Sequence, residues 1–231
     1  MKTKTLLIAA AALVAGVISS DAQVYSANIV GYANVVLPGN GQLSLVSNPF
    51  DDGNGNYLTN ILNSSLVKQS QVLTWNGSGF TIIQKGGTPA NWPAGTVTQL
   101  PPGTGFFVRN GGPGSGAADL TNTFVGSVIA PVGTFVTNSE PIGLTLQGST
   151  IPYAGNIAYA AQGGGDTNLD YGNGLTKQSQ ILTWDPVGQT YLISQKGGSP
   201  ATWGATVPIS VGQGFFINNK NGPNTNMVQG L

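Results

Sequence analysis

Two octapeptides, KQSQVLTW at residues 68–75 and KQSQILTW at residues 177–184, differ at a single position. Such a repeat marks a doubled active site, a doubled binding site or a doubled fold element. Two further pairs of segments repeat after them in the same order: QKGGTPANW at 84–92 with QKGGSPATW at 195–203, and PGTGFFVRN at 102–110 with VGQGFFINN at 211–219. We therefore predict that the chain contains two copies of one module.

A weaker repeat surrounds these segments. IVGYANVVLP from residue 29 resembles FVGSVIAP from residue 124, and the C-terminal NMVQGL resembles both. Either the two modules share the middle VG segment, or it closes the first module while the last segment closes the second. The predicted divisions are a signal peptide at 1–22, a first module at 23–122 and a second module at 123–231.

Gly and Pro interrupt the chain at short intervals, with brief runs of β-branched and aromatic residues between them. This pattern is typical of antiparallel strands joined by tight turns. We predict an all-β fold of two tandem antiparallel β-sandwich-like modules that arose by internal duplication, with a short helix at 57–62. The expected strands are 28–37, 43–47, 71–75, 80–84, 105–109, 124–129, 181–184, 191–195 and 214–218.

The strand at 80–84 and its counterpart at 191–195 show what the repeat preserves. Strand side chains alternate between two faces. One face keeps its chemistry: Phe80, Ile82 and Gln84 correspond to Tyr191, Ile193 and Gln195. The other face changes, with Ser194 in place of Ile83. A half-buried strand has one such constrained face, so we predict that the preserved face is core.

The N-terminal residues have the features of a signal peptide. Lys2 and Lys4 precede the apolar run at residues 6–18, and small residues suit cleavage before Gln23. The run is short for a membrane span, and a retained anchor is the alternative. We predict a secreted protein, extracellular or at the cell surface, with no membrane span after cleavage.

Charged residues make up only 7% of the chain, which has no His and no Cys. Removing residues 1–22 takes away Lys2, Lys4 and Asp21, and leaves six basic against seven acidic side chains. This balance offers no basic patch for nucleic acid. Without His and Cys, Ser-His-Asp catalysis, Cys-His catalysis and ordinary zinc sites are excluded. Paired carboxylates for glycoside cleavage remain an alternative, but no acid recurs at matched positions, so we predict no catalytic residue.

Four shared side chains are candidate ligand-binding residues. Trp92 and Trp203 lie in Gly/Pro-rich loops, where an exposed indole ring can stack on a sugar; packing is the alternative. Lys85 and Lys196 recur beside these tryptophans, and a lysine can bind an anion. More commonly, a lysine in such a place is solvated at the end of a strand or protects a sheet edge from pairing with another chain. The tryptophans that end the two octapeptides are predicted to be buried.

Calcium is the one cofactor that the sequence leaves open. Oxygen-bearing residues at alternate positions can converge on a hard cation. Two segments have this pattern: Asp52, Asn54 and Asn56 in DDGNGN, and Asp166, Asn168 and Asp170 in GDTNLDYGNG. Both lack the distal Glu of an EF-hand, and Asx-rich turns are the alternative.

Three segments, LSLVSNPF at 43–50, LTWNGSGF at 73–80 and LPPGTGFFV at 100–108, together resemble a module of uncharacterised secreted bacterial proteins. That module has an N-P-aromatic segment, a W-x-x-x-G-[FY] hairpin and a P-G-x-G-F-F-[VI] strand. The whole chain is similar to secreted repeat proteins of Verrucomicrobia-type bacteria. The resemblance covers 29–110 and 177–219, and the N-P-aromatic segment is degenerate in the second copy, at 138–142. It implies a surface or extracellular β module without a particular activity.

These observations favour a secreted, non-enzymatic structural or adhesive protein of the cell surface or extracellular matrix. The additional VG segment suggests self-association into a homo-oligomer or polymer by strand addition at an open edge. The alternative is a glycan-binding protein that uses Trp92 and Trp203. A glycosidase is the least favoured of the three.

Overall fold

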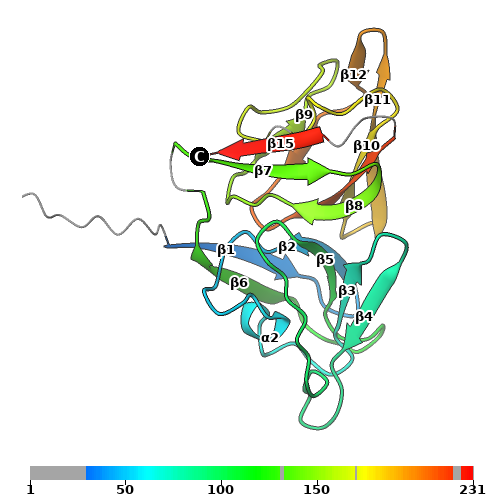
Figure 1. The fold of residues 1–231 in the computed structure, drawn as a ribbon. Coiled ribbons are helices and arrows are strands. Elements are labelled where there is room, and N and C mark those ends of the chain that lie inside the picture. Colours follow the sequence, from blue (N-terminus) through cyan, green and yellow to red (C-terminus); the bar gives the residue numbers. More distant parts are fainter. Residues whose placement is uncertain (1–29, 131–132, 170, 221–224, 231) are drawn as a thin grey trace, which may run out of the picture.

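A computed structural model describes residues 30–130, 133–169, 171–220 and 225–230 (Figure 1). All its named strand pairs are antiparallel and its one named helix is a single turn, so the predicted all-β class is confirmed. The predicted signal peptide and Asp170 lie outside the described residues. Within the described ranges, no helix is long and apolar enough to cross a bilayer.

The elements follow in two series. The first half contains β1 (Val30–Leu37), β2 (Leu43–Ser47), α2 (Leu58–Ile61), β3 (Gln71–Trp75), β4 (Phe80–Gln84), β5 (Gly105–Arg109) and β6 (Leu120–Ser127). The second half contains β7 (Phe135–Glu140), β8 (Gly143–Gly148), β9 (Gly155–Ala158), β10 (Gln180–Asp185), β11 (Thr190–Gly198), β12 (Ala201–Trp203), β13 (Val207–Ile209), β14 (Gly214–Asn219) and β15 (Thr225–Gly230).

The two large sheets repeat one strand order. The first sheet runs β2-β5-β3-β4, and the second runs β8-β14-β10-β11-β12. Leu45 lies opposite Phe107 in the first sheet, and Leu146 lies opposite Phe216 in the second. β8 is therefore the counterpart of β2, and the N-P-aromatic segment corresponds to the residues that follow β8. Its assignment to residues 138–142 is wrong, because Ser149-Thr150-Ile151 follows β8 where Asn48-Pro49-Phe50 follows β2, and these replacements obscure the match.

Two-stranded ribbons account for the three VG segments. β1 pairs with β6 over eight residues, and β7 pairs with β15 over six. The observed arrangement is the one in which the middle segment closes the first half and the last segment closes the second. The boundary predicted after residue 122 falls within β6, which pairs with the first half. Since β15 already pairs with β7, it is not the spare strand from which strand addition was inferred.

In each half, one two-stranded ribbon packs against the large sheet: β1–β6 in the first half and β9–β13 in the second. In the first half, Leu37 of β1 and Phe124 of β6 join Phe106 of β5 in one buried cluster. In the second half, Ile157 of β9 and Phe215 of β14 lie in a separate buried cluster. Each half therefore has a sandwich-like core of its own.

A third apolar cluster joins the two large sheets, which lie one above the other in Figure 1. Its buried centre is Leu45, Phe107 and Phe216. The Trp184 ring packs edge-on against Phe107 with 5.2 Å between centroids, and the Trp75 ring packs edge-on against Phe216 at 5.8 Å. The two halves therefore share a core in addition to their own.

The two octapeptide tryptophans make matched hydrogen bonds between the halves. Trp75 Nε1 donates to the Leu144 carbonyl at 3.0 Å, and Trp184 Nε1 donates to the Leu43 carbonyl at 2.9 Å. Leu43 and Leu144 hold equivalent positions on β2 and β8. Contacts that are reciprocal in this way are characteristic of a twofold dimer, and here they lie within one chain.

The glycines of GTGFF and GQGFF serve this contact between the halves. Gly103 and Gly212 have φ values of +84° and +80°, in the left-handed region that favours glycine. Gly105 leaves space of another kind: a Cβ there would lie 2.6 Å from the Gln147 carbonyl oxygen of the other half. A Cβ at Gly214 would likewise lie 2.6 Å from the Val46 carbonyl oxygen of the first half. The motif therefore combines a tight turn with a close approach of two backbones.

The octapeptides also make the same local contacts twice. Gln69 and Gln178 both have left-handed φ values, +69° and +73°. The Gln71 side-chain amide donates to Gln84 Oε1 at 2.7 Å, and the counterpart pair in the second half is bonded at 3.2 Å. The glutamines are thus repeated because each half uses them in a turn and in a cross-strand pair.

The prediction that the preserved hairpin face is core is wrong. On that face, Ile82 and Ile193 are 55% and 58% exposed. On the changing face, Ser194 is buried and Ile83 packs against the first core. The preserved face instead lies toward the other half, where Phe80 and Tyr191 contact the shared aromatic cluster. The alternation of preserved and changing side chains was interpreted as one buried face and one exposed face. Each large sheet instead packs on both of its faces, so this interpretation failed.

Candidate functional site

The structure brings the four predicted ligand-binding residues together in two pairs, one in each half. Lys85 Nζ lies 5.8 Å from the centre of the Trp92 ring, and Lys196 Nζ lies 5.7 Å from that of Trp203. Both lysines are buried. The alternative role for these lysines, a solvated side chain at a strand end or at an open sheet edge, is therefore wrong.

Backbone carbonyls accept hydrogen bonds from the buried ammonium groups. Lys85 Nζ donates to the carbonyls of Ser64 and Leu66 at 2.6 and 2.7 Å. Lys196 Nζ donates to the Gly172 carbonyl at 2.9 Å. Burial lowers the pKa of Lys85, because desolvation disfavours its charged form. Each lysine thus holds the loop before its octapeptide against the hairpin, which is a structural role.

The tryptophans of these pairs are packing residues. Trp203 is only 1% exposed and leaves no ring face for a ligand. Trp92 is half-buried and packs against the first core. Stacking of Trp203 on a sugar is therefore excluded in this fold. The recurrence of Lys with Trp in both copies was the sequence signal for this shared structural unit.

In the first predicted calcium-binding segment, side-chain oxygens accept hydrogen bonds from backbone amides of the same segment. Asp52 Oδ1 accepts hydrogen bonds from the amides of Asn54 and Asn56 at 2.7 and 2.8 Å. Asn56 Oδ1 in turn accepts from the Asp52 amide at 3.0 Å. These bonds form Asx turns. The three side chains therefore stabilise a loop, and Asp52 Oδ1 and Asn56 Oδ1 are directed at backbone amides.

The second segment is used in a similar way. Asp166 Oδ2 accepts from the Asn156 amide at 2.6 Å, and its other oxygen accepts from the Tyr159 hydroxyl. Asp166 thereby ties β9 to the following loop, near Asn168; the third predicted ligand, Asp170, lies outside the described residues. In the described part of the chain, no three acidic side chains gather where a metal could bind.

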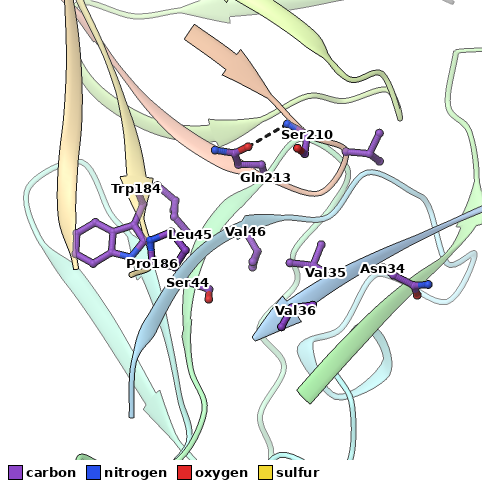
Figure 2. Close-up of a pocket in the computed structure, with 11 residues that line it drawn as sticks. Asn34, Val35, Val36, Ser44, Leu45, Val46, Trp184, Pro186, Ser210 and Gln213 are labelled. Atoms are coloured by element: carbon purple, nitrogen blue, oxygen red, sulfur yellow. Dashed lines mark hydrogen bonds between the residues drawn. The ribbon is translucent and has the colours of Figure 1, made fainter. Parts of the chain in front are cut away.

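The structure adds a groove that the sequence did not indicate. It has a volume of about 310 Å³ and lies between β1 and β2 of the first half and the β10–β11 turn and β13–β14 loop of the second (Figure 2). Its walls come from both halves: Asn34, Val35, Val36, Ser44, Leu45, Val46, Trp184, Pro186, Ser210, Val211 and Gln213. A second groove of about 310 Å³ adjoins it and shares Trp184, Ser210 and Gln213.

The shared residues of the two grooves are held in place. The Trp184 indole donates to the Leu43 carbonyl and packs edge-on against Tyr191 at 4.9 Å. Gln213 Oε1 accepts from the Ser210 amide at 3.0 Å, the dashed line in Figure 2. None of the residues that line either groove is charged. The lining therefore suits the binding of a neutral molecule and offers no group for acid–base catalysis.

No protein-family model, no curated protein and no solved structure matches this chain. The similarity to secreted bacterial repeat proteins stays a prediction. The function is therefore inferred from the surfaces and sites of this molecule.

Proposed function

We propose that this chain is a secreted, non-enzymatic structural or adhesive protein of the cell surface or extracellular matrix. The observation that carries the proposal is the outer face of the β1–β6 ribbon. Val30, Tyr32, Val36 and Val125 lie on that face and are between 56% and 75% exposed. Contiguous exposed apolar patches on soluble proteins mark interaction surfaces.

The register of the ribbon gathers these side chains on one face. Tyr32 lies opposite Val125, and Asn34 lies opposite Thr123, whose hydroxyl donates to Asn34 Oδ1 at 2.7 Å. The other face carries Phe124 into the first core. The outer face of the ribbon has no charged side chain in its described length. It therefore forms a flat apolar strip edged by hydroxyl and amide groups, which suits adhesion to an uncharged surface.

The placement of the acidic side chains supports a non-catalytic role. Asp51, Asp52 and Asp185 accept hydrogen bonds from nearby backbone amides in exposed turns. Glu140 is buried in the second half. No acid lines either groove around Trp184. Glycoside cleavage requires two carboxylates that face one substrate, and the absence of any acid from the lining of these grooves supports a non-enzymatic role.

The ribbon face can be tested by replacing Tyr32 and Val125 together with Thr, which retains a preference for strands. Adsorption of the purified protein to an octyl-coated sensor surface should fall at least fivefold. The unfolding midpoint should change little, because exposed substitutions shift stability by about 0.5 kcal/mol or less. Val187→Thr is the matched control, since Val187 is exposed in the β10–β11 turn, away from the ribbon. Unchanged adsorption of the double variant, or an equal loss with the control, would contradict the proposal.

A further inference from the structure

We propose that the two adjoining grooves around Trp184 form a binding site for a neutral oligosaccharide. An adhesive role of the β1–β6 ribbon does not require this site. Both grooves are lined by Trp184, Ser210 and Gln213, none of which belongs to the ribbon, and Asn34 and Val36 of the ribbon's outer face line one of them. Trp92 and Trp203, the rings expected to stack on sugars, take no part in it.

The two grooves adjoin at three residues. Trp184, Ser210 and Gln213 line both. Each groove has a volume of about 310 Å³, and ligand pockets in proteins begin at about 300 Å³. An elongated ligand that passes these shared residues would therefore occupy both grooves, as successive units of a chain do.

The lining combines apolar side chains, many of them aliphatic, with uncharged polar groups. Trp184 and Pro186 offer apolar surface, and Figure 2 shows them close together on one side of the groove. Asn34, Ser210 and Gln213 offer amide and hydroxyl groups. A sugar combines apolar C–H faces with hydroxyls that must stay hydrogen-bonded. The lack of charge in both linings favours a neutral ligand over a uronic acid or an anion.

The aromatic wall is fixed before any ligand arrives. Trp184 Nε1 donates to the Leu43 carbonyl at 2.9 Å, and the ring packs edge-on against Phe107 and Tyr191. The Gln189 side chain also binds Leu43. Its Nε2 donates to the Leu43 carbonyl, and its Oε1 accepts from the Leu43 amide. A ring that is already ordered loses little entropy when it binds.

Hydrogen bonds along the edge of β2 disfavour an extended peptide as the ligand of these grooves. A peptide that adds to a sheet edge needs free backbone groups along that edge. The outer edge of β2 is already bonded at both ends: the Leu43 amide donates to Gln189 Oε1 at 2.9 Å, and the Ser47 amide donates to the Gly212 carbonyl at 2.8 Å. This geometry favours a ligand recognised by side chains.

The internal symmetry supplies a matched control. Trp75 makes the same bond to the other half, to the Leu144 carbonyl, and packs edge-on against Phe216. Trp75 lines neither of the two grooves. Trp184→Phe and Trp75→Phe therefore remove equivalent structural contacts, but only the first changes the proposed site. Ser210→Trp is a second variant: Ser210 is exposed, and its described bonds to Gln213 use its backbone, so a larger side chain would fill the groove without disturbing a core.

The test is calorimetric titration of the full mature chain with cellohexaose, xylohexaose and mannohexaose, with hexagalacturonate as the charged comparison. At least one neutral hexasaccharide should bind with a Kd below about 1 mM, typical of a shallow site. Ser210→Trp should abolish that binding, Trp184→Phe should weaken it at least fivefold, and Trp75→Phe should leave it within twofold.

Three results would overturn the inference. The first is no binding of any neutral hexasaccharide, including the case in which an uncharged Ser/Thr/Val octapeptide binds instead. The second is full affinity in Ser210→Trp. The third is an equal loss in Trp75→Phe and Trp184→Phe. None of these results bears on octyl-surface adsorption, which depends on Tyr32 and Val125.

Discussion

Leu37 and Glu140 occupy equivalent positions in the two halves, although one is a leucine and the other a carboxylic acid. The Asn110 side-chain amide donates to the Leu37 carbonyl, and that of Asn219 donates to the Glu140 carbonyl. Leu37 is 1% exposed and Glu140 is 0% exposed. Glu140 Oε2 accepts from the Thr145 hydroxyl at 3.1 Å, and burial raises the pKa of the carboxyl. The second half therefore contains a buried acid where the first half has an apolar contact.

Glu140→Leu should stabilise the protein at pH 7 by about 1–3 kcal/mol, because a buried ionisable group is often replaced by an apolar one with a gain in stability. The raised pKa means that the folded state keeps its proton where the unfolded carboxyl, with an ordinary value of 4.5, has lost it. The folded state then binds more protons, so the free energy of unfolding of the wild type falls as pH rises above that value. Urea denaturation at pH 4 and pH 7 should show the larger gain at pH 7.

The reverse exchange provides the control for this prediction. Leu37→Glu places a carboxyl in the apolar core of the first half and should destabilise the protein by at least about 3 kcal/mol at pH 7. An equal gain of Glu140→Leu at both pH values would show that ionisation of Glu140 does not contribute to stability.

Among the elements, β5 and β14 determine how closely the halves approach. Each begins with a glycine at the point where a strand of the other half passes. Gly214 is buried, and a Cβ there would lie 2.6 Å from the Val46 carbonyl oxygen. Since that neighbour is backbone, the strand itself would have to move.

Gly214→Ala should therefore destabilise the protein by about 2–4 kcal/mol through overpacking. Guanidinium denaturation measures this loss, and hydrogen exchange of the Ser47 amide should accelerate because its bond to the Gly212 carbonyl is adjacent. Gly197→Ala in β11 is the matched control, since a Cβ there has no heavy-atom neighbour within 4 Å. Equal effects of the two substitutions would argue against the close approach.

At the scale of the molecule, the shared cluster of Leu45, Phe107 and Phe216 joins the two halves through buried apolar contacts. Separate unfolding of either half would expose this cluster, and burial of apolar surface contributes about 25 cal/mol per Å². We therefore expect a single unfolding transition, with coincident curves from tryptophan fluorescence and far-UV circular dichroism. Gly105→Ala combined with Gly214→Ala should weaken the coupling and separate the two curves. Two transitions in the unmodified protein would contradict this expectation.

Sequence reasoning was most successful for the strands of the two large sheets. The expected strands at 71–75, 80–84 and 105–109 coincide with β3, β4 and β5, because turn residues bound them on each side. β7, β8, β9, β12 and β13 were missed. For β7, β8 and β9, the second copy diverges before its octapeptide, so comparison with the first copy offered no guide. β12 and β13 follow the octapeptide, but the first half has no named strand at the corresponding place between β4 and β5.

The groove around Trp184 could not be predicted from the sequence, for a different reason. Its lining comes from four separate segments, at residues 34–36, 44–46, 184–186 and 210–213. No spacing along the chain brings them together, since they meet only when the first half packs against the second. The buried Lys85 and Lys196 were misjudged for a similar reason, because the carbonyls that accept their hydrogen bonds belong to distant loops.

The amino-acid sequence by itself determined the all-β class, the repeat and the positions of its recurrent strands, because turn chemistry and side-chain alternation are local properties. The tertiary structure decided which sheet faces are buried, which ribbon closes each half and where a groove opens. Those outcomes depend on how two sheets pack against each other. Packing between distant segments is set by shape and close approach, as at Gly105 and Gly214, and local pattern does not encode it.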